Sequence, residues 1–244
     1  MTTRSIMHRA RTLLGLPPRH EPKPPSQPHW RSLLGLERRP IRTVIDVGAY
    51  DGDTAKFFRR QFPEATVHCF EPQPKQFRAL QQWAETQDGR VTCHPQALGE
   101  TNGSAILQSY PQMPRYASIR SATDAWTAEY SRTRPLQAVP IEIQVRRLDD
   151  MMSELSLVDD VLIKIDTEGF EREVLRGGMD VMARASACIV EVSLEQRFSN
   201  QTHFRDLLDL LGTAGMHYVG NVHHGILQSG DVGFFDALFM RPMA

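Results

Sequence analysis

The 244-residue sequence predicts an α/β fold, a doubly wound and mostly parallel sheet of seven strands with helices on both faces. Three short apolar runs support this prediction, because each has the length of a buried strand and each stops abruptly at glycine or acidic residues. They begin at Thr43, Thr66 and Val161. Open α/β sheets bind ligands beside the carboxyl ends of their strands. The polar residues that follow the three runs therefore predict a ligand site along one edge of the sheet.

The first run is followed by a glycine turn. The β-branched residues of 43–47 end at Gly48, and Gly52 precedes the start of a helix at Thr54. Glycine has no Cβ, so it adopts positive φ readily and lets a ligand approach the bare backbone, while the free N–H groups of the next helix face the same crevice. The residues that we expect to bind a polar cofactor here are Asp46, Gly48, Tyr50, Gly52 and Thr54.

The second run ends at an acid whose position is informative. Glu71 lies 23 residues after Gly48, and a carboxylate about 20 residues beyond such a turn is suited to accepting hydrogen bonds from two ribose hydroxyls. Dinucleotide sites usually need a third glycine, which is missing here. Asp51 and Asp53 would also repel a pyrophosphate, whereas they would tolerate a sulfonium or an amino group. The local charge therefore favours S-adenosylmethionine over NAD as the cofactor.

The third run becomes sharply polar before an expected helix over 172–184. It places Lys164, Asp166, Glu168 and Glu171 within eight residues, and such ionisable groups at a strand tip often mark a functional site. A structural alternative is that Asp166 and Glu168 cap the helix while Lys164 pairs with one of them. We predict that Lys164, Asp166 and Glu168 are catalytic and that Asp166 also contacts the cofactor. A carboxylate here could act as a base, orient the acceptor or bind an amino group.

The rest of the chain supplies the remaining predicted elements. A third strand over 90–94 precedes Ala97, which we expect at the adenine pocket. A long loop between two extended segments, 105–109 and 140–145, is expected to cover the acceptor site, because long loops in compact domains are usually functional or mobile. Further on we expect helices at 148–155 and 203–211, a strand at 187–192, and an antiparallel hairpin at the sheet edge from 218–222 and 237–240.

Ordered motifs in the chain match those of a known family. They are DVGAYDG from Asp46 to Gly52, FEP from Phe70 to Pro72, ALG from Ala97 to Gly99, Leu148-Asp149, KIDTEGFE from Lys164 to Glu171, and Glu191-Val192. Over roughly residues 42–195 the chain thus resembles the FkbM family of S-adenosylmethionine-dependent methyltransferases, although Tyr50 stands where the family often carries asparagine. The resemblance implies a class I methyltransferase that methylates hydroxyl groups of glycans or secondary metabolites.

Methyl transfer to a hydroxyl benefits from a base, and histidines and a metal ion both need consideration. His94, at a strand end, and the pair His223-His224, expected in the hairpin loop, are base candidates by position. Asp166, Glu168 and Glu191 at neighbouring strand tips offer oxygen ligands that would suit magnesium. Their spacing does not demand a metal ion, and we assign none.

Two other classes of protein share parts of this pattern. An NAD-dependent oxidoreductase would use the same strand, turn and acid, and a noncatalytic interaction module would keep the fold without the chemistry. The missing third glycine argues against the oxidoreductase. The sequence favours a methyltransferase acting on a small-molecule or glycan acceptor.

Composition limits the partners and the compartment. The net charge of −1 offers no general attraction to nucleic acid, and no apolar stretch reaches the length of a membrane span. The three cysteines are odd in number and lack metal-ligand spacing, so we expect reduced thiols and a cytoplasmic location.

Residues 1–40 differ from the rest of the chain. They contain seven prolines and eight Lys or Arg against two Glu, a composition that disfavours packing. We therefore expect a mobile basic segment before a methyltransferase domain over 41–244. A short repeat, RTLLGL at Arg11 and RSLLGL at Arg31, could dock on a partner or a membrane surface. Alternatively, its leucines pack on the catalytic domain.

Overall fold

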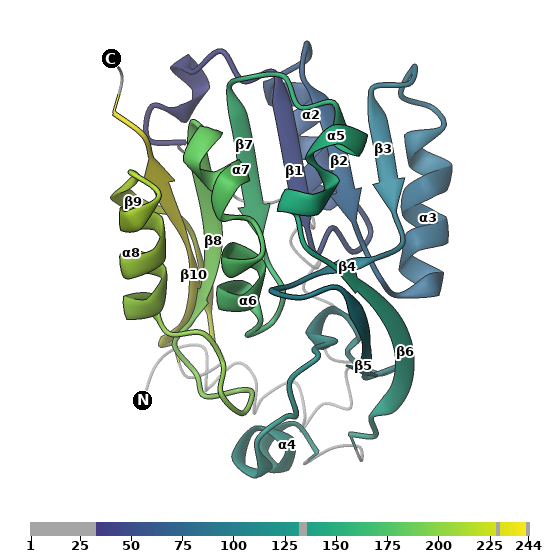
Figure 1. Ribbon diagram of the computed structural model, residues 1–244. Helices are drawn as coiled ribbons and strands as arrows, with labels where there is room; N and C mark the ends of the chain where they lie inside the picture. The colour runs from purple at the N-terminus through teal and green to yellow at the C-terminus, as the bar shows by residue number, and fades with distance from the viewer. Residues whose placement is uncertain (1–32, 132–135, 228–229, 243–244) are drawn as a thin grey trace, which may run out of the picture.

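The computed structural model describes residues 33–131, 136–227 and 230–242. The predictions for residues 1–32, including the first copy of the short repeat, lie outside these residues. The described part forms one seven-stranded sheet covered by helices and a second, three-stranded sheet (Figure 1).

The main sheet has the strand order β3-β2-β1-β7-β8-β10-β9. Only β10 runs against the others, since it pairs antiparallel with both of its neighbours. The predicted seven strands with six in one direction are confirmed. The antiparallel strand itself was expected at the edge, but it lies one place inside, and β9 is the edge strand. The strands are β1 (Thr43–Val47), β2 (Thr66–Phe70), β3 (Val91–His94), β7 (Val161–Ile165), β8 (Ala187–Ser193), β9 (His217–Ile226) and β10 (Val232–Met240).

Helices cover both faces of this sheet, as predicted. Every residue of β1 and β7 is buried, because parallel strands at the centre of such a sheet have no solvent face. One core cluster joins the sheet to α2 and α3, and the other joins it to α5 through α8. The helices are α2 (Asp53–Gln61), α3 (Pro74–Ala84), α5 (Met152–Leu155), α6 (Glu171–Arg176), α7 (Met179–Arg184) and α8 (Phe204–Thr213).

The helix predicted over 172–184 is two helices. α6 ends at Arg176 and α7 begins at Met179, with Gly177 and Gly178 between them. A Cβ on Gly177 would lie 1.9 Å from the carbonyl oxygen of Gly99, so only glycine lets this break rest against the ALG motif. The single-helix prediction was wrong because the apolar periodicity continues through the two glycines.

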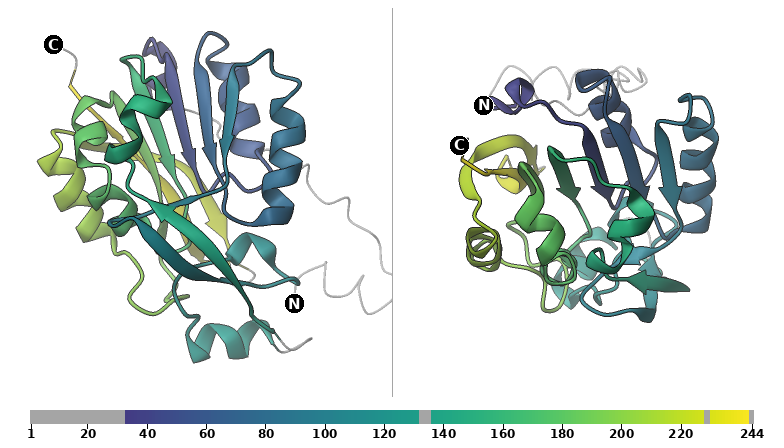
Figure 2. Two further views of the ribbon diagram at one scale, coloured as in Figure 1. Left: turned by 45° about the vertical axis from the view of Figure 1, so that its right-hand side comes forward. Right: turned by 45° about the horizontal axis from the view of Figure 1, so that its top comes forward.

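A second sheet lies across the carboxyl ends of the parallel strands (Figures 1 and 2). It has the order β4-β6-β5, formed by Ala97–Leu98, Val139–Arg146 and Gly103–Ser109. The two predicted extended segments are therefore strands, β5 and β6, and they pair with each other in this second sheet. Between them lie the short helices η2 (Pro114–Tyr116) and α4 (Asp124–Tyr130). The helix predicted at 148–155 consists of η3 (Asp149–Met151) followed by α5.

The fold begins before the predicted boundary at residue 41. Leu33 and Leu36 are buried in the core cluster that also includes residues of α2 and α3, and Leu36 opens the short helix η1 (Leu36–Arg38). Leucines from the second copy of the repeat thus pack on the domain, which is the alternative considered from the sequence.

The three cysteines are free. Among the described residues, no helix has both the length and the apolar character needed to cross a membrane.

Replacing Gly177 with alanine tests the contact between the helix break and the ALG motif. The added methyl group would overlap the backbone of Gly99, so we expect a loss of about 1–3 kcal/mol in the free energy of unfolding. Gly212→Ala in α8 is the control, because its Cβ would meet nothing within 4 Å. Chemical denaturation measures both; equal stability of the two variants would contradict the contact.

Candidate functional site

The turn after β1 rests directly on the tip of β7. Gly48 has φ 81°, and a Cβ at this position would lie 1.9 Å from the carbonyl oxygen of Asp166. The N–H groups of Gly48 and Ala49 both donate to the carbonyl oxygen of Phe70, at 3.0 Å. Glycine is therefore required where three strand ends meet, and the bare backbone of the turn faces the cavities described next.

Glu71 is held by backbone donors. Its two carboxylate oxygens accept from the N–H of Tyr50 at 2.9 Å and of Gln73 at 2.8 Å. Burial raises the pKa of Glu71 to about 7, although these two hydrogen bonds lower it. The orientation of the carboxylate is thus fixed, and its remaining lone pairs can accept two hydroxyl groups.

A first cavity lies between the ends of β1, β2 and β7 and the second sheet. Its walls are mainly apolar, with Glu71, Asp166 and Glu168 as its acids, which suits a flat base attached to a ribose. The remaining lining residues include Phe70, Ala97, Leu98, Leu107, Ile119 and Phe170.

A second, more polar cavity adjoins the first. The two cavities share five lining residues, so ligands bound in them would lie next to each other. The shared residues are Gly48, Tyr50, Arg115, Asp166 and Glu168. The further lining of the second cavity comes from Asp51, Asp53, Thr54, Tyr116, Lys164, Glu191, Arg197, His223, Phe234 and Asp236.

Lys164 lies under the floor of the second cavity with 2% of its side chain exposed. Its Nζ is 3.0 Å from Asp236 and 3.3 Å from Asp166. Burial acts to lower the pKa of Lys164, but these carboxylates raise it well above its ordinary value. The ion pair with Asp166 matches the structural alternative considered from the sequence, and it places a permanent cation beneath the acids.

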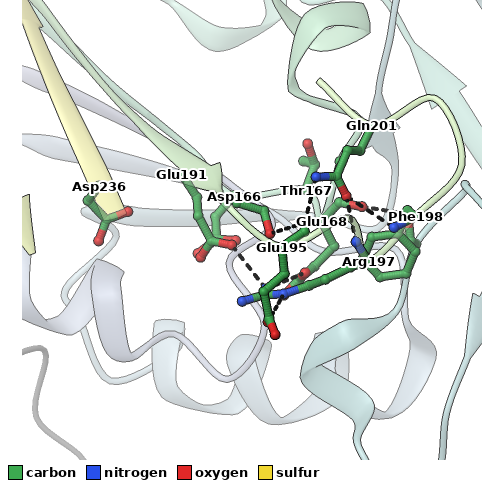
Figure 3. Close-up of polar contacts among 12 residues, drawn as sticks. Asp166, Thr167, Glu168, Glu191, Glu195, Arg197, Phe198, Gln201 and Asp236 are labelled. Atoms are coloured by element: carbon green, nitrogen blue, oxygen red, sulfur yellow. Dashed lines mark hydrogen bonds and ion pairs between the residues drawn. The ribbon is translucent and has the colours of Figure 1, made fainter. Parts of the chain in front are cut away.

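Arg197 is a second buried cation, and the sequence analysis did not identify it (Figure 3). Its side chain is 3% exposed and lies 3.4 Å from Glu168, 3.6 Å from Glu191 and 3.3 Å from Glu195. Burial, and then Asp166, raises the pKa of Glu168 to about 8. Arg197 follows β8 in a segment without a recognisable motif, so no sequence signal could have singled it out.

Asp166, Glu168 and Glu191 approach each other closely enough to share a metal ion. One oxygen from each lies within 4.8 Å of the others. The donor set would suit a hard cation, but Arg197 pairs with two of the acids and Lys164 with the third. The cluster thus carries its own counter-ions, so its charge is balanced without a divalent metal ion.

A segment around η2 covers both cavities. Arg115 lies over the ring of Tyr50, with 4.5 Å to its centroid, and pairs with Asp51 at 2.9 Å. The hydroxyl of Ser118 donates to the carbonyl oxygen of Glu168 at 2.7 Å. The long segment between the two extended stretches therefore reaches the loops after β1 and β7 and lies against both cavities.

The predicted cofactor residues separate into three groups. Gly48, Tyr50, Glu71, Ala97 and Asp166 line the first cavity, and Thr54 lines the second. Asp46 and Gly52 line neither of the two. Asp46 is 1% exposed, and burial raises its pKa to about 7; Gly52 packs against Leu80 of α3. These two residues therefore belong to the packed part of the turn and do not line either cavity.

The histidines lie in different surroundings. His94 stacks on Phe70, and burial lowers its pKa to about 4; it lines neither cavity. His223 lines the second cavity, and His224 does not. Both were expected in a hairpin loop, which was wrong, because β9 continues to Ile226. Pairing with β10 extends the strand beyond the apolar residues that predicted it.

The chain is similar in sequence to known methyltransferases. The family model of the methyltransferase FkbM domain matches residues 46–219. The 2-O-methyltransferase NoeI of Sinorhizobium fredii is 28% identical over 194 residues, covering 74% of this chain and 75% of that protein. The 31-O-demethyl-FK506 methyltransferase FkbM of Streptomyces tacrolimicus is 30% identical, covering 60% and 63%. A crystal structure of methyltransferase FkbM from Methylobacillus flagellatus has a TM-score of 0.48 at 17% identity, covering 82% of this chain and 44% of that one.

The family match covers more than half of the chain and includes the glycine turn, Glu71 and the strand tip at Asp166. The chain therefore belongs to the FkbM family of methyltransferases.

Proposed function

We propose that this protein transfers a methyl group from S-adenosylmethionine to a hydroxyl group, and that the adenosine and the acceptor occupy the first and second cavities. The observation that carries the proposal is that the two cavities meet at Gly48, Asp166 and Glu168. A displacement at the methyl carbon needs donor and acceptor in line, and adjoining cavities can hold them so.

Charge supports the choice of cofactor. Six acidic side chains line the second cavity against three basic ones, and Glu71 lines the first, so the excess of acids favours a cationic sulfonium over an anionic pyrophosphate. Glu71 would accept the ribose hydroxyls, while Gly48 would let the cofactor approach the backbone. An NAD-dependent oxidoreductase and a noncatalytic module are not favoured by this site or by the family. The six acids are Asp51, Asp53, Asp166, Glu168, Glu191 and Asp236, and the basic residues are Arg115, Lys164 and Arg197.

The reacting centre would lie beside Asp166 and Glu168. Asp166, paired with Lys164, would attract the sulfonium or its amino group. Glu168, held by Arg197, would contact the acceptor. Lys164 would act through Asp166 and Asp236, because its buried ammonium group pairs with both carboxylates.

The acceptor is proposed to be a hydroxyl on a sugar, a glycan or a secondary metabolite. The names of two relatives, 2-O-methyltransferase NoeI and 31-O-demethyl-FK506 methyltransferase FkbM, support oxygen as the methylated atom. We propose a cytoplasmic location, in keeping with the free thiols.

Glu71→Gln tests the cofactor site. Loss of the charged acceptor should raise the Kd for S-adenosylmethionine roughly tenfold to a hundredfold, measured by isothermal titration calorimetry. Glu64→Gln is the matched control, since its side chain is 73% exposed at the surface. Unaltered affinity in Glu71→Gln, with an unchanged circular dichroism spectrum, would rule out this carboxylate as the ribose ligand.

The affinity for S-adenosylmethionine should also depend on pH. Glu71 has a pKa of about 7 in the empty site, and hydroxyl donors favour its ionised form. The Kd should therefore fall as the pH rises from about 6 to 8, with protons released on binding, by up to about tenfold for this one group. Calorimetry in buffers of different ionisation enthalpy counts the protons. If Glu71→Gln releases as many as the wild type, another group is responsible.

A further inference from the structure

His223 on the edge strand faces a buried carboxylate of the neighbouring strand. It lies opposite Asp236 in the register of β9 and β10. Its Nδ1 is 3.4 Å from Oδ2 of Asp236, and the two side chains are 23% and 6% exposed. One nitrogen of the imidazole is thus turned toward the protein interior.

The carboxylate of Asp236 is kept ionised. Its other oxygen lies 3.0 Å from Nζ of Lys164. Burial acts to raise the pKa of Asp236, but Lys164 and His223 lower it below its ordinary value. An ionised carboxylate can only accept a hydrogen bond, so it favours the tautomer of His223 with its proton on Nδ1. Nε2 then carries a free lone pair, and it has no partner among the described residues.

The position of this ring suits a base better than the nearby acids do. His223 lines the second cavity with Asp166 and Glu168. Asp166 is paired with Lys164, and Glu168 is held by Arg197, so neither acid is as free to take up a proton as an unpaired ring nitrogen. Phe234 packs beside the ring at 5.7 Å between centroids, which restricts its rotation.

We propose that His223 is the general base of the methyl transfer and that Asp236 is its positioning residue. This inference rests on the proposed function and adds to it the group that receives the proton. The hydroxyl oxygen forms a bond to the methyl carbon as the bond from carbon to sulfur breaks, with its electron pair remaining on sulfur. The hydroxyl proton passes to Nε2 of His223, and the resulting imidazolium is stabilised by Asp236 until it releases the proton to water.

His224 is a built-in control for this role. Neighbouring residues of a strand point to opposite faces, and His224 contacts Asn221 at 3.3 Å and the ring of Phe235 at 6.4 Å. It does not line the described cavities. The two histidines thus share strand and residue type but not access to the site.

Other charged groups would contribute to any pH dependence of the reaction. They face the same cavity from each surrounding element, and their effects would be common to the wild type and both histidine variants. They are Asp51 and Asp53 near α2, Arg115 and Tyr116 on η2, Lys164, Asp166 and Glu168 on and after β7, Glu191 and Arg197 on and after β8, and Asp236 on β10.

The first test needs no acceptor. Nitrogen-15 NMR of the imidazole rings in the whole protein, with His223→Gln used for assignment, reports which nitrogen carries the proton. The neutral ring of His223 should have its proton on Nδ1, and Asp236→Asn should mix the two tautomers. A proton on Nε2 in the wild type would overturn the proposal, because no lone pair would then face the acceptor.

The second test measures methyl transfer to a panel of methyl glycosides by the formation of S-adenosylhomocysteine. His223→Gln can still donate to Asp236, and it should lower kcat roughly a hundredfold or more. It should leave the Kd for S-adenosylmethionine unchanged, and its rate should fall less on acidification than the rate of the wild type. His224→Gln should match the wild type. A kcat for His223→Gln within about threefold of the wild type would overturn the proposal.

Failure of the proposed function would appear differently. The wild type would then not bind S-adenosylmethionine in the calorimeter. If it binds the cofactor but methylates no glycoside, the acceptor class is wrong, and the tautomer measurement alone decides on His223.

Discussion

The buried ammonium of Lys164 is the interaction on which the rest of the site depends. It joins the tip of β7 to the antiparallel strand β10 through Asp166 and Asp236, at 3.3 and 3.0 Å. Asp236, with 6% of its side chain exposed, can lie this deep in the sheet only because a cation neutralises it, and removing one partner of such a pair leaves an uncompensated buried charge. One of these acids is then directed to the joined cavities and the other to His223.

Charge in the remainder of the site is balanced in the same way. Arg197 compensates Glu168 and Glu191, while burial raises the pKa of Glu71 and of Glu168 toward neutrality. An empty site of this kind opposes full ionisation of its acids, and a bound cation relieves that cost. The same acids that destabilise the empty cavity are therefore suited to a positively charged methyl donor.

Much of this arrangement could be predicted from local sequence. The parallel strands, the glycine turn and Glu71 carry short-range signals, because a buried strand needs consecutive apolar residues and a close backbone approach needs glycine. The break at Gly177 was missed, since apolar periodicity continues through it. The position of β10 inside the edge was missed as well, because hairpin signals specify which strands pair but not which of them meets β8.

The sequence by itself determined the α/β class, the carboxyl edge that holds the site, and the residues of its turns and strand tips. Tertiary structure alone decided which distant charges meet there. Arg197 and Asp236 meet Glu168 and Lys164 only through strands and loops remote in sequence, and Arg115 reaches Asp51 only because a second sheet forms. The physical reason is that strand ends are encoded by neighbouring residues, whereas a buried ion pair is stabilised by partners that the chain brings together only on folding.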